Sequence, residues 1–176
     1  MPSPVGHALG GVIVGQVLTP GRAWLLAVVA VAPDLDFLWG RHNMETHSVG
    51  AALVVGLVAL AAGGGRDVRF ALACALAVIS HVFFDWLGSD TTPPLGVMAL
   101  WPWSSEYHFA DAFLFEAISR RYWLDNFWMH NVWAVGREVL MLGPIAGALW
   151  WWRTKDNTKT TKVTKDKQID SSSWPS

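Results

Sequence analysis

The sequence predicts an all-α fold, a polytopic membrane helical bundle with about five transmembrane helices and one further helix in the membrane interface. Of its 176 residues, 52% are hydrophobic and only 15% are charged, whereas about a quarter of the residues in a typical soluble domain are charged. The apolar residues also gather into segments of nearly the length that a bilayer requires. These observations favour one membrane-embedded domain over residues 1–152, followed by a polar tail over residues 153–176.

The predicted membrane spans are the apolar segments 5–18, 23–39, 48–62, 69–87 and 136–152. A spanning helix needs about 17–25 residues, so the short first and third segments require tilt, local thinning of the bilayer or burial against neighbours. Small residues in these two segments, including Gly11, Gly15 and Gly56, suit close packing of helices in lipid.

A longer, tryptophan-rich stretch separates the fourth and fifth segments, over residues 88–135. Within it, Phe109, Phe113 and Ala117 recur at helical spacing beside charged residues. This pattern predicts a helix that lies in the interface plane, although an ordinary packed loop helix fits equally well.

The distribution of charge predicts the orientation in the membrane. Every lysine lies beyond residue 153, in a Lys/Thr/Ser-rich tail that is too polar to fold and is predicted to be disordered. With alternating spans, the tail shares one side with the short links at 19–22 and 63–67. The positive-inside rule places that side in the cytoplasm, so we expect a multi-pass membrane protein whose N-terminus is outside and whose C-terminus is cytoplasmic.

Histidines and aspartates gather at the opposite, outer face of the predicted bundle. These residues are His7, Asp34, Asp36, His47, His81 and Asp85. Each lies at an end of an apolar segment, and alternating spans bring all of these ends to the same side of the membrane. Ionisable residues in apolar segments are costly and indicate function, and this convergence predicts a metal site.

The residue types and their spacing favour a divalent metal. His81 and Asp85 are four residues apart, so they share one helical face and can bind one ion. A proline precedes Asp34 and Asp36, so the backbone there is irregular, and one carboxylate can bind metal while the other orients a ligand or accepts a proton. Imidazole and carboxylate ligands suit zinc, with manganese or iron as alternatives. The single cysteine, Cys74, excludes a thiolate-rich zinc site.

Other interpretations of these residues remain open. The two aspartates could pair with Arg41 to hold helices in register, and His81 with Asp85 could be a buried pair without metal. The same residues could carry metal ions or protons across the bilayer, or the chain could be a non-catalytic membrane anchor that binds a partner. Nucleic-acid binding is not expected from the dispersed basic tail. Four weaker site candidates have no assigned role: His108, Asp111, His130 and Glu138.

The order of several motifs carries a family resemblance. These motifs are His7 in a small-residue helix, Pro-Asp-Leu-Asp at 33–36, His-Asn-Met-Glu-Thr-His-Ser at 42–48, His-Val-Phe-Phe-Asp at 81–85 and Gly-Val-Met-Ala-Leu-Trp-Pro-Trp at 96–103. Over roughly residues 5–105 the chain resembles the YdjM-like family of inner-membrane metal-dependent hydrolases. Two positions depart from the family's motifs: Asn43 stands where an arginine is usual, and Phe37 stands where a histidine is common. The role of His42 is not assigned.

The resemblance implies a helical membrane hydrolase. Its ligand order is also similar to that of zinc-dependent phospholipase C and related single-strand nucleases, which cleave phosphoesters with a metal cluster. The likeness implies as ligands His7, Asp34 or Asp36, His47, His81 and Asp85. Because of the two departures, the number of metal ions stays open.

Together, the residues and the resemblance predict a membrane-bound hydrolase that acts on a phosphoester, lipid or lipid-linked, at the exoplasmic membrane face. A bound divalent ion lowers the pKa of a water from about 15.7 towards about 7. Asp34 and Asp36 are expected to serve as ligand and general base. Membrane lipid is the expected partner, and the oligomeric state is not predicted.

Overall fold

The computed structural model describes residues 1–39, 43–91 and 93–172, apart from the side chains of residues 39 and 157–172. Every named element in this part of the chain is helical, which confirms the all-α prediction. The helices are α1 (Pro4–Leu18), α2 (Ala23–Val31), α3 (Val49–Ala62), α4 (Val68–Trp86) and α5 (Phe127–Ser172), with 3₁₀ segments η1 (Pro20–Arg22) and η2 (Ala32–Trp39).

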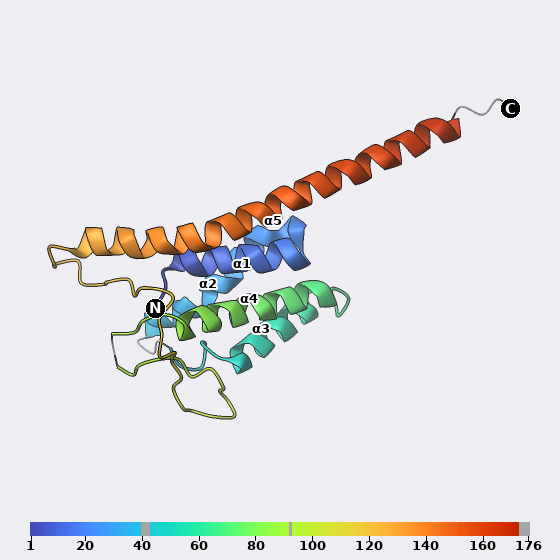
Figure 1. Ribbon diagram of the computed structural model, residues 1–176. Helices are drawn as coiled ribbons and strands as arrows, with labels where there is room; N and C mark the ends of the chain where they lie inside the picture. The colour runs from blue at the N-terminus through green and yellow to red at the C-terminus, as the bar shows by residue number, and fades with distance from the viewer. Residues whose placement is uncertain (40–42, 92, 173–176) are drawn as a thin grey trace.

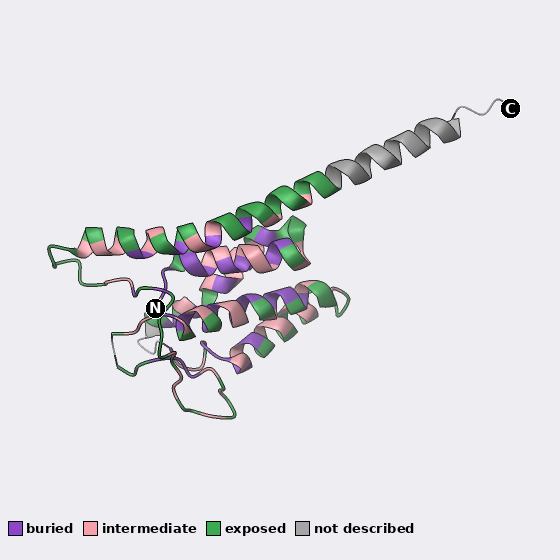
Figure 2. Cartoon of the chain, viewed as in Figure 1, coloured by how far each residue is buried: buried purple, intermediate pink, exposed green. Residues whose placement is uncertain are grey.

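The helices pack as a layered bundle around α1, α2 and α4. Helix α1 contacts α2, α4 and α5, while α3 packs on the other side of α4 (Figure 1). The buried core lies where α2 meets α4 and includes Leu26 and Ala77 (Figure 2). A methyl group on Gly11 of α1 would overlap the Leu26 carbonyl oxygen. The small residue therefore permits the close crossing of α1 and α2, as expected for helices that pack in lipid.

The sequence contains the signals that start these helices. Ser3, Ser48 and Asp67 cap α1, α3 and α4, and the side chain of each accepts a hydrogen bond from a backbone N–H in the first turn. Such caps satisfy donors that have no partner within the helix. The link between α3 and α4 turns through Gly64 and Gly65, whose φ values are 62° and 74°. This left-handed backbone favours glycine.

The second apolar segment forms two elements rather than one span. Helix α2 ends at Val31, and the backbone continues as the 3₁₀ segment η2. Pro33 lacks a backbone N–H and so cannot continue the α-helical hydrogen bonding. The predicted irregular backbone around Asp34 and Asp36 is therefore observed.

Two helices in the described chain are long and apolar enough to cross a membrane. They are α4, with 19 residues, and the first 30 residues of α5, Phe127–Asp156. Helices α1 and α3 are apolar but shorter, with 15 and 14 residues. The predicted five-span bundle is therefore not confirmed as such, although all the predicted spans except 23–39 correspond to continuous helices.

The predicted interfacial helix is wrong. The stretch between α4 and α5 contains no helix in its described residues. Phe109 and Phe113 are 51% and 52% exposed, while Phe115 and Ala117 are 1% and 9% exposed. Glu116, between the two buried residues, is exposed, and this alternation over residues 115–117 is typical of extended chain. Backbone N–H groups of this stretch donate to carbonyl oxygens at the end of α4, so tertiary hydrogen bonds replace those of a local helix.

The polar tail also differs from its prediction. Instead of a disordered segment from residue 153, the backbone of α5 remains helical to Ser172 and extends well past the bundle (Figure 1). The sequence has neither glycine nor proline between residues 148 and 174. No strong helix breaker therefore interrupts the hydrogen bonding that begins in the apolar part of α5.

Helix α5 holds both ends of α1. The fully buried carboxylate of Glu138 accepts hydrogen bonds from the Ser3 N–H at 2.7 Å, the Gly6 N–H at 3.1 Å and the Ser3 hydroxyl. At the other end, the Arg153 guanidinium donates to two carbonyl oxygens of α1, at 3.1 and 2.8 Å. A negative charge at the helix N-terminus and a positive one at its C-terminus both complement the helix dipole.

We predict that Glu138→Ala destabilises the protein by about 2–3 kcal/mol, because it leaves the buried Ser3 N–H and hydroxyl without their carboxylate acceptor. Thermal unfolding in detergent measures this change. Glu116→Ala is the control. Glu116 is half-exposed and lies 3.8 Å from Arg137, and an exposed ion pair of this kind contributes little to stability. Equal melting temperatures of the two variants would contradict the assignment.

Candidate metal centre

Five side chains from separate elements converge at one end of the bundle. They are His7 of α1, Asp34 of η2, His47 just before α3, and His81 and Asp85 of α4. The histidines and Asp85 are at most 1% exposed, and Asp34 is 25% exposed. We call this set the His/Asp cluster.

Local structure explains how each side chain reaches the cluster. His81 and Asp85 lie one turn apart near the C-terminal end of α4, and His7 lies in the first turns of α1, which packs against α4. The 3₁₀ turn after Pro33 carries Asp34 towards the same end. Residue 48 caps α3, so His47 stands immediately outside the helix.

Asp85 occupies the centre of the His/Asp cluster. Its Oδ1 lies 3.3 Å from Nε2 of His7, and its Oδ2 lies 3.0 Å from Nε2 of His81 and 3.5 Å from Nε2 of His47. Oδ1 of Asp34 lies 3.7 and 3.8 Å from Nε2 of His47 and His81. Ligands bound tetrahedrally at about 2.0–2.1 Å are about 3.3–3.4 Å apart. The spacing therefore fits the first coordination shell of one ion.

Several polar atoms of the cluster are buried without a hydrogen bond. They include both ring nitrogens of His7, Nε2 of His81 and both carboxylate oxygens of Asp85. The rings of His7 and His81 are stacked, with centroids 3.8 Å apart. Buried polar groups are nearly always hydrogen-bonded, and a buried charge without a partner is costly. A divalent cation would satisfy these atoms together, so the residues fit a metal.

A second layer of contacts orients two of the histidines. Nδ1 of His81 lies 2.7 Å from the Ala30 carbonyl oxygen, which requires the proton on Nδ1 and leaves the Nε2 lone pair facing the cluster. Nδ1 of His47 lies 3.1 Å from Oδ2 of Asp36, and the Thr46 hydroxyl donates to the same oxygen at 2.5 Å. Carbonyl and carboxylate partners of this kind fix metal-binding imidazoles in place.

Asp36 therefore has a different place from the ligand and general-base roles predicted for it. Its carboxylate contacts Nδ1, the outer nitrogen of His47, and Asp36 belongs to neither of the two groups with metal-binding spacing. Thr46 was not among the predicted site residues, although it directly precedes His47 in the sequence. Its position next to His47 was the feature of the sequence that could have identified it as a site residue.

The geometry favours one ion over two. The two groups with metal-binding spacing are His7, Asp34 and His81, and His47, His81 and Asp85. Both depend on His81, whose Nδ1 is engaged by the Ala30 carbonyl oxygen. A single Nε2 atom is then common to both groups, so they describe one shared centre.

The charge state of His47 is set by its acidic neighbours. Burial alone would lower the pKa of His47, but the neighbouring carboxylates of Asp34 and Asp36 raise that pKa to about 9. In the absence of metal the imidazole is thus protonated at neutral pH. Metal binding would displace this proton.

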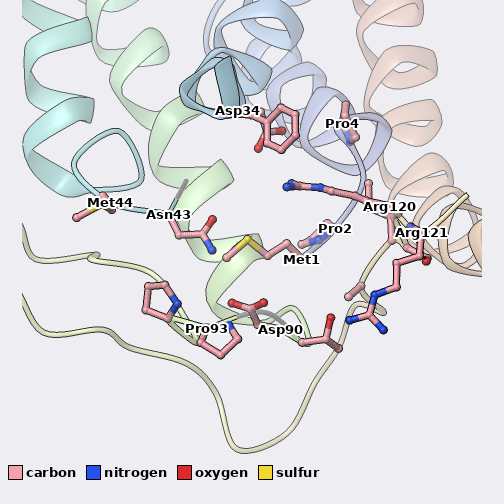
Figure 3. Close-up of a pocket in the computed structure, with 16 residues that line it drawn as sticks. Met1, Pro2, Pro4, Asp34, Asn43, Met44, Asp90, Pro93, Arg120 and Arg121 are labelled. Atoms are coloured by element: carbon pink, nitrogen blue, oxygen red, sulfur yellow. Dashed lines mark hydrogen bonds between the residues drawn. The ribbon is translucent and has the colours of Figure 1, made fainter. Parts of the chain in front are cut away.

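A cavity of about 760 Å³ lies beside the cluster (Figure 3). Asp34 lines it, together with Asn43, Arg120 and Arg121. Asp34 therefore connects the buried centre with the space in which a ligand would bind. The two arginines were not among the predicted site residues, because the stretch that carries them was expected to form an interfacial helix or a packed loop helix.

The weaker candidates lie outside both metal-binding groups. His130 contacts the Ala117 carbonyl oxygen at 2.7 Å, Glu138 holds the N-terminus of α1, and His108 pairs with Val97 in an isolated bridge. Asp111 is exposed. Arg41 and His42 lie outside the described residues.

The fold and the cluster define a class of protein, an all-helical chain with membrane-length helices and a buried His/Asp site suited to one divalent ion. Within that class, the chain belongs to the YdjM inner membrane protein family, whose model matches residues 1–157. It is also similar to inner membrane protein YbcI of Escherichia coli (strain K12), with 31% identity over 129 residues, covering 62% of this chain and 73% of the relative. No solved structure matches. The family confirms the predicted resemblance and the inner-membrane location.

We predict that Asp36→Asn weakens metal affinity by about 10–100-fold, the usual effect of losing an outer-layer partner, while saturating metal still binds. Titration of the metal-stripped protein in detergent measures the affinity. Asp111→Asn removes an exposed carboxylate outside the cluster and should leave the affinity unchanged. Identical affinities for the Asp36 variant and the wild type would contradict the orienting role.

Proposed function

We propose that this chain is a membrane-bound, metal-dependent hydrolase that acts on a phosphoester, lipid or lipid-linked, at the exoplasmic face of the inner membrane. The observation that carries this proposal is the buried His/Asp cluster, in which Asp34 faces a cavity large enough for a substrate group. A cluster used only to hold helices together would not need a route to a cavity of this kind.

In this proposal, four residues bind the ion: His7, His47, His81 and Asp85. Zinc suits this mixture of imidazole and carboxylate, with manganese or iron as alternatives. A divalent ion, when bound, supplies Lewis acidity that lowers the pKa of a water to about 7. The chain's own contribution is to fix the imidazoles through Ala30 and Asp36 and to exclude bulk water from the buried side of the site.

Asp34 has the position expected of a proton acceptor. It is 25% exposed and lines the cavity, whereas the other members of the cluster are buried. Its Oδ1 is also 3.7 and 3.8 Å from two histidine nitrogens, so it can share a hydrogen bond or a metal with them. We propose that Asp34 accepts a proton from the attacking water and completes the ligand set when substrate is absent.

Transport is less well supported than hydrolysis. The ionisable residues lie at one end of the bundle, where α1 and α3 begin and α4 ends. Transport sites lie near the middle of the membrane. No observation on the described chain favours a continuous polar route.

We predict that purified protein loaded with zinc cleaves a phosphoester presented in mixed micelles, and that Asp34→Asn lowers kcat by about 10²–10⁴-fold, the usual contribution of a general base. Asp125→Asn is the control, because Asp125 is exposed in the loop before α5. A panel of phosphate monoesters and diesters, some soluble and some lipid-linked, tests the substrate class. Absence of turnover on the whole panel by metal-loaded protein would refute the hydrolase.

In the proposed topology the His/Asp cluster is outside, and the lysine-rich end of α5 is in the cytoplasm. The membrane is crossed by α1, α3, α4 and α5, and α2 together with η2 forms a fifth pass. We predict that, in a Cys74→Ala background, an impermeant thiol reagent applied to intact spheroplasts labels Glu106→Cys and not Arg66→Cys. Residue 66 lies in the α3–α4 link, at the other end of the bundle from the cluster. The reverse labelling pattern would invert the orientation.

A further inference from the structure

The cavity beside Asp34 carries two positive side chains, Arg120 and Arg121. Both come from the chain just before α5, about 85 residues after Asp34 in the sequence. In Figure 3 the Arg120 side chain extends into the cavity between Asp34 and Met1, and Arg121 lies at its edge. The hydrolytic mechanism proposed above uses neither residue.

The position of Arg120 is tied to the element that carries Asp34. Its guanidinium carbon lies 4.5 Å from the centre of the Phe37 ring, a distance typical of a cation–π interaction. Phe37 follows Asp34 by three residues in η2. The guanidinium is therefore held against the segment that carries Asp34.

The backbone that presents the arginines is fixed by several hydrogen bonds. The Ala117 N–H donates to the Ser89 hydroxyl at 2.8 Å. The Ser119 N–H donates to Oδ1 of Asn131 at 2.7 Å, and Nδ2 of Asn131 donates back to the Ser119 carbonyl oxygen at 3.0 Å. His130 also contacts the carbonyl oxygen of residue 117, at 2.7 Å. The first turn of α5 thus preorganises this segment.

Asn43 adds a polar group to the same cavity. Its side chain is 6% exposed, and its Oδ1 is buried without a hydrogen bond. Its backbone has φ 68°, a left-handed conformation that is uncommon outside glycine. The unpartnered Oδ1 can accept a hydrogen bond only from a donor such as a substrate hydroxyl, whereas the Nδ2 group of the same amide can donate to a phosphate oxygen.

We propose that this cavity binds a phosphate group, with Arg120 as its principal ligand-binding residue, Arg121 as a second cation and Asn43 as a hydrogen-bonding wall. The inference rests on the proposed function and names the part of the substrate that is recognised. The planar guanidinium matches a phosphate through paired hydrogen bonds. The carboxylate of Asp90 also lines the cavity. It is engaged by the protein backbone, because its Oδ2 accepts a hydrogen bond from the Gly96 N–H at 3.1 Å.

Binding of phosphate to full-length protein in detergent tests this assignment. Inorganic phosphate and phosphatidic acid in mixed micelles are titrated separately by calorimetry, each with metal-stripped and with zinc-loaded protein. Arg120→Gln should weaken the binding of at least one of these ligands by about tenfold. Arg66→Gln removes the same charge at the other end of the bundle and should leave binding unchanged. Metal content, measured on every sample, should be equal in both variants and the wild type.

The outcomes separate the two proposals. Loss of affinity for both ligands in Arg120→Gln supports recognition of the phosphate group itself, and loss for phosphatidic acid alone supports recognition of a lipid-borne phosphate. Wild-type protein that binds neither ligand, or equal affinities in Arg120→Gln and wild type, would overturn the phosphate site. Arginine-dependent binding to a protein that takes up no metal would instead preserve this site and refute the metal-dependent function.

Discussion

Burial of the Asp85 carboxylate among three imidazoles is the interaction on which this end of the molecule depends. The side chain is 1% exposed, and neither of its oxygens makes a hydrogen bond. A lone buried carboxylate is costly, because water no longer solvates its charge. The proton on His47 relieves part of this cost, and a divalent ion at the centre would relieve it more completely. The cluster is therefore best understood as one electrostatic unit, not as separate ion pairs.

The rest of the bundle keeps this unit in place. Helix α1 brings His7 to the cluster only if it crosses α2 closely, which Gly11 permits, and if its N-terminus stays fixed, which Glu138 achieves. Helix α5 therefore acts on the site in two ways. It holds α1 through Glu138, and through Asn131 it holds the loop that carries Arg120. A single helix thus couples the metal centre with the adjacent cavity.

The sequence was sufficient to predict which side chains meet, because that prediction needs only the order and alternation of helices. His81 and Asp85 follow from four-residue spacing, and His7 and His47 follow from their places at segment ends. The role of Asp36 could not be predicted, because it depends on which nitrogen of His47 the carboxylate faces. That detail is set by the three-dimensional path of the chain between η2 and α3.

The wrongly predicted interfacial helix and the unpredicted cavity have a common physical cause. A pattern such as Phe109, Phe113 and Ala117 predicts a helix only when local hydrogen bonds prevail. Here the backbone bonds instead to the end of α4, and Phe115 supplies the buried contact. Tertiary partners remote in sequence also create the Arg120 cavity. Local periodicity contains no information about such partners, so the cavity became visible only in the folded chain.

X-ray absorption spectroscopy of the zinc-loaded protein would show whether the His/Asp cluster binds the ion, since it reports the atoms that surround the metal. We expect imidazole scattering from about three histidines, with nitrogen and oxygen ligands at about 2.0–2.1 Å and no sulfur. His81→Ala/Asp85→Ala should lose the bound zinc. A spectrum without inner-shell imidazole, or undiminished zinc in the double variant, would contradict the His/Asp cluster as a metal centre.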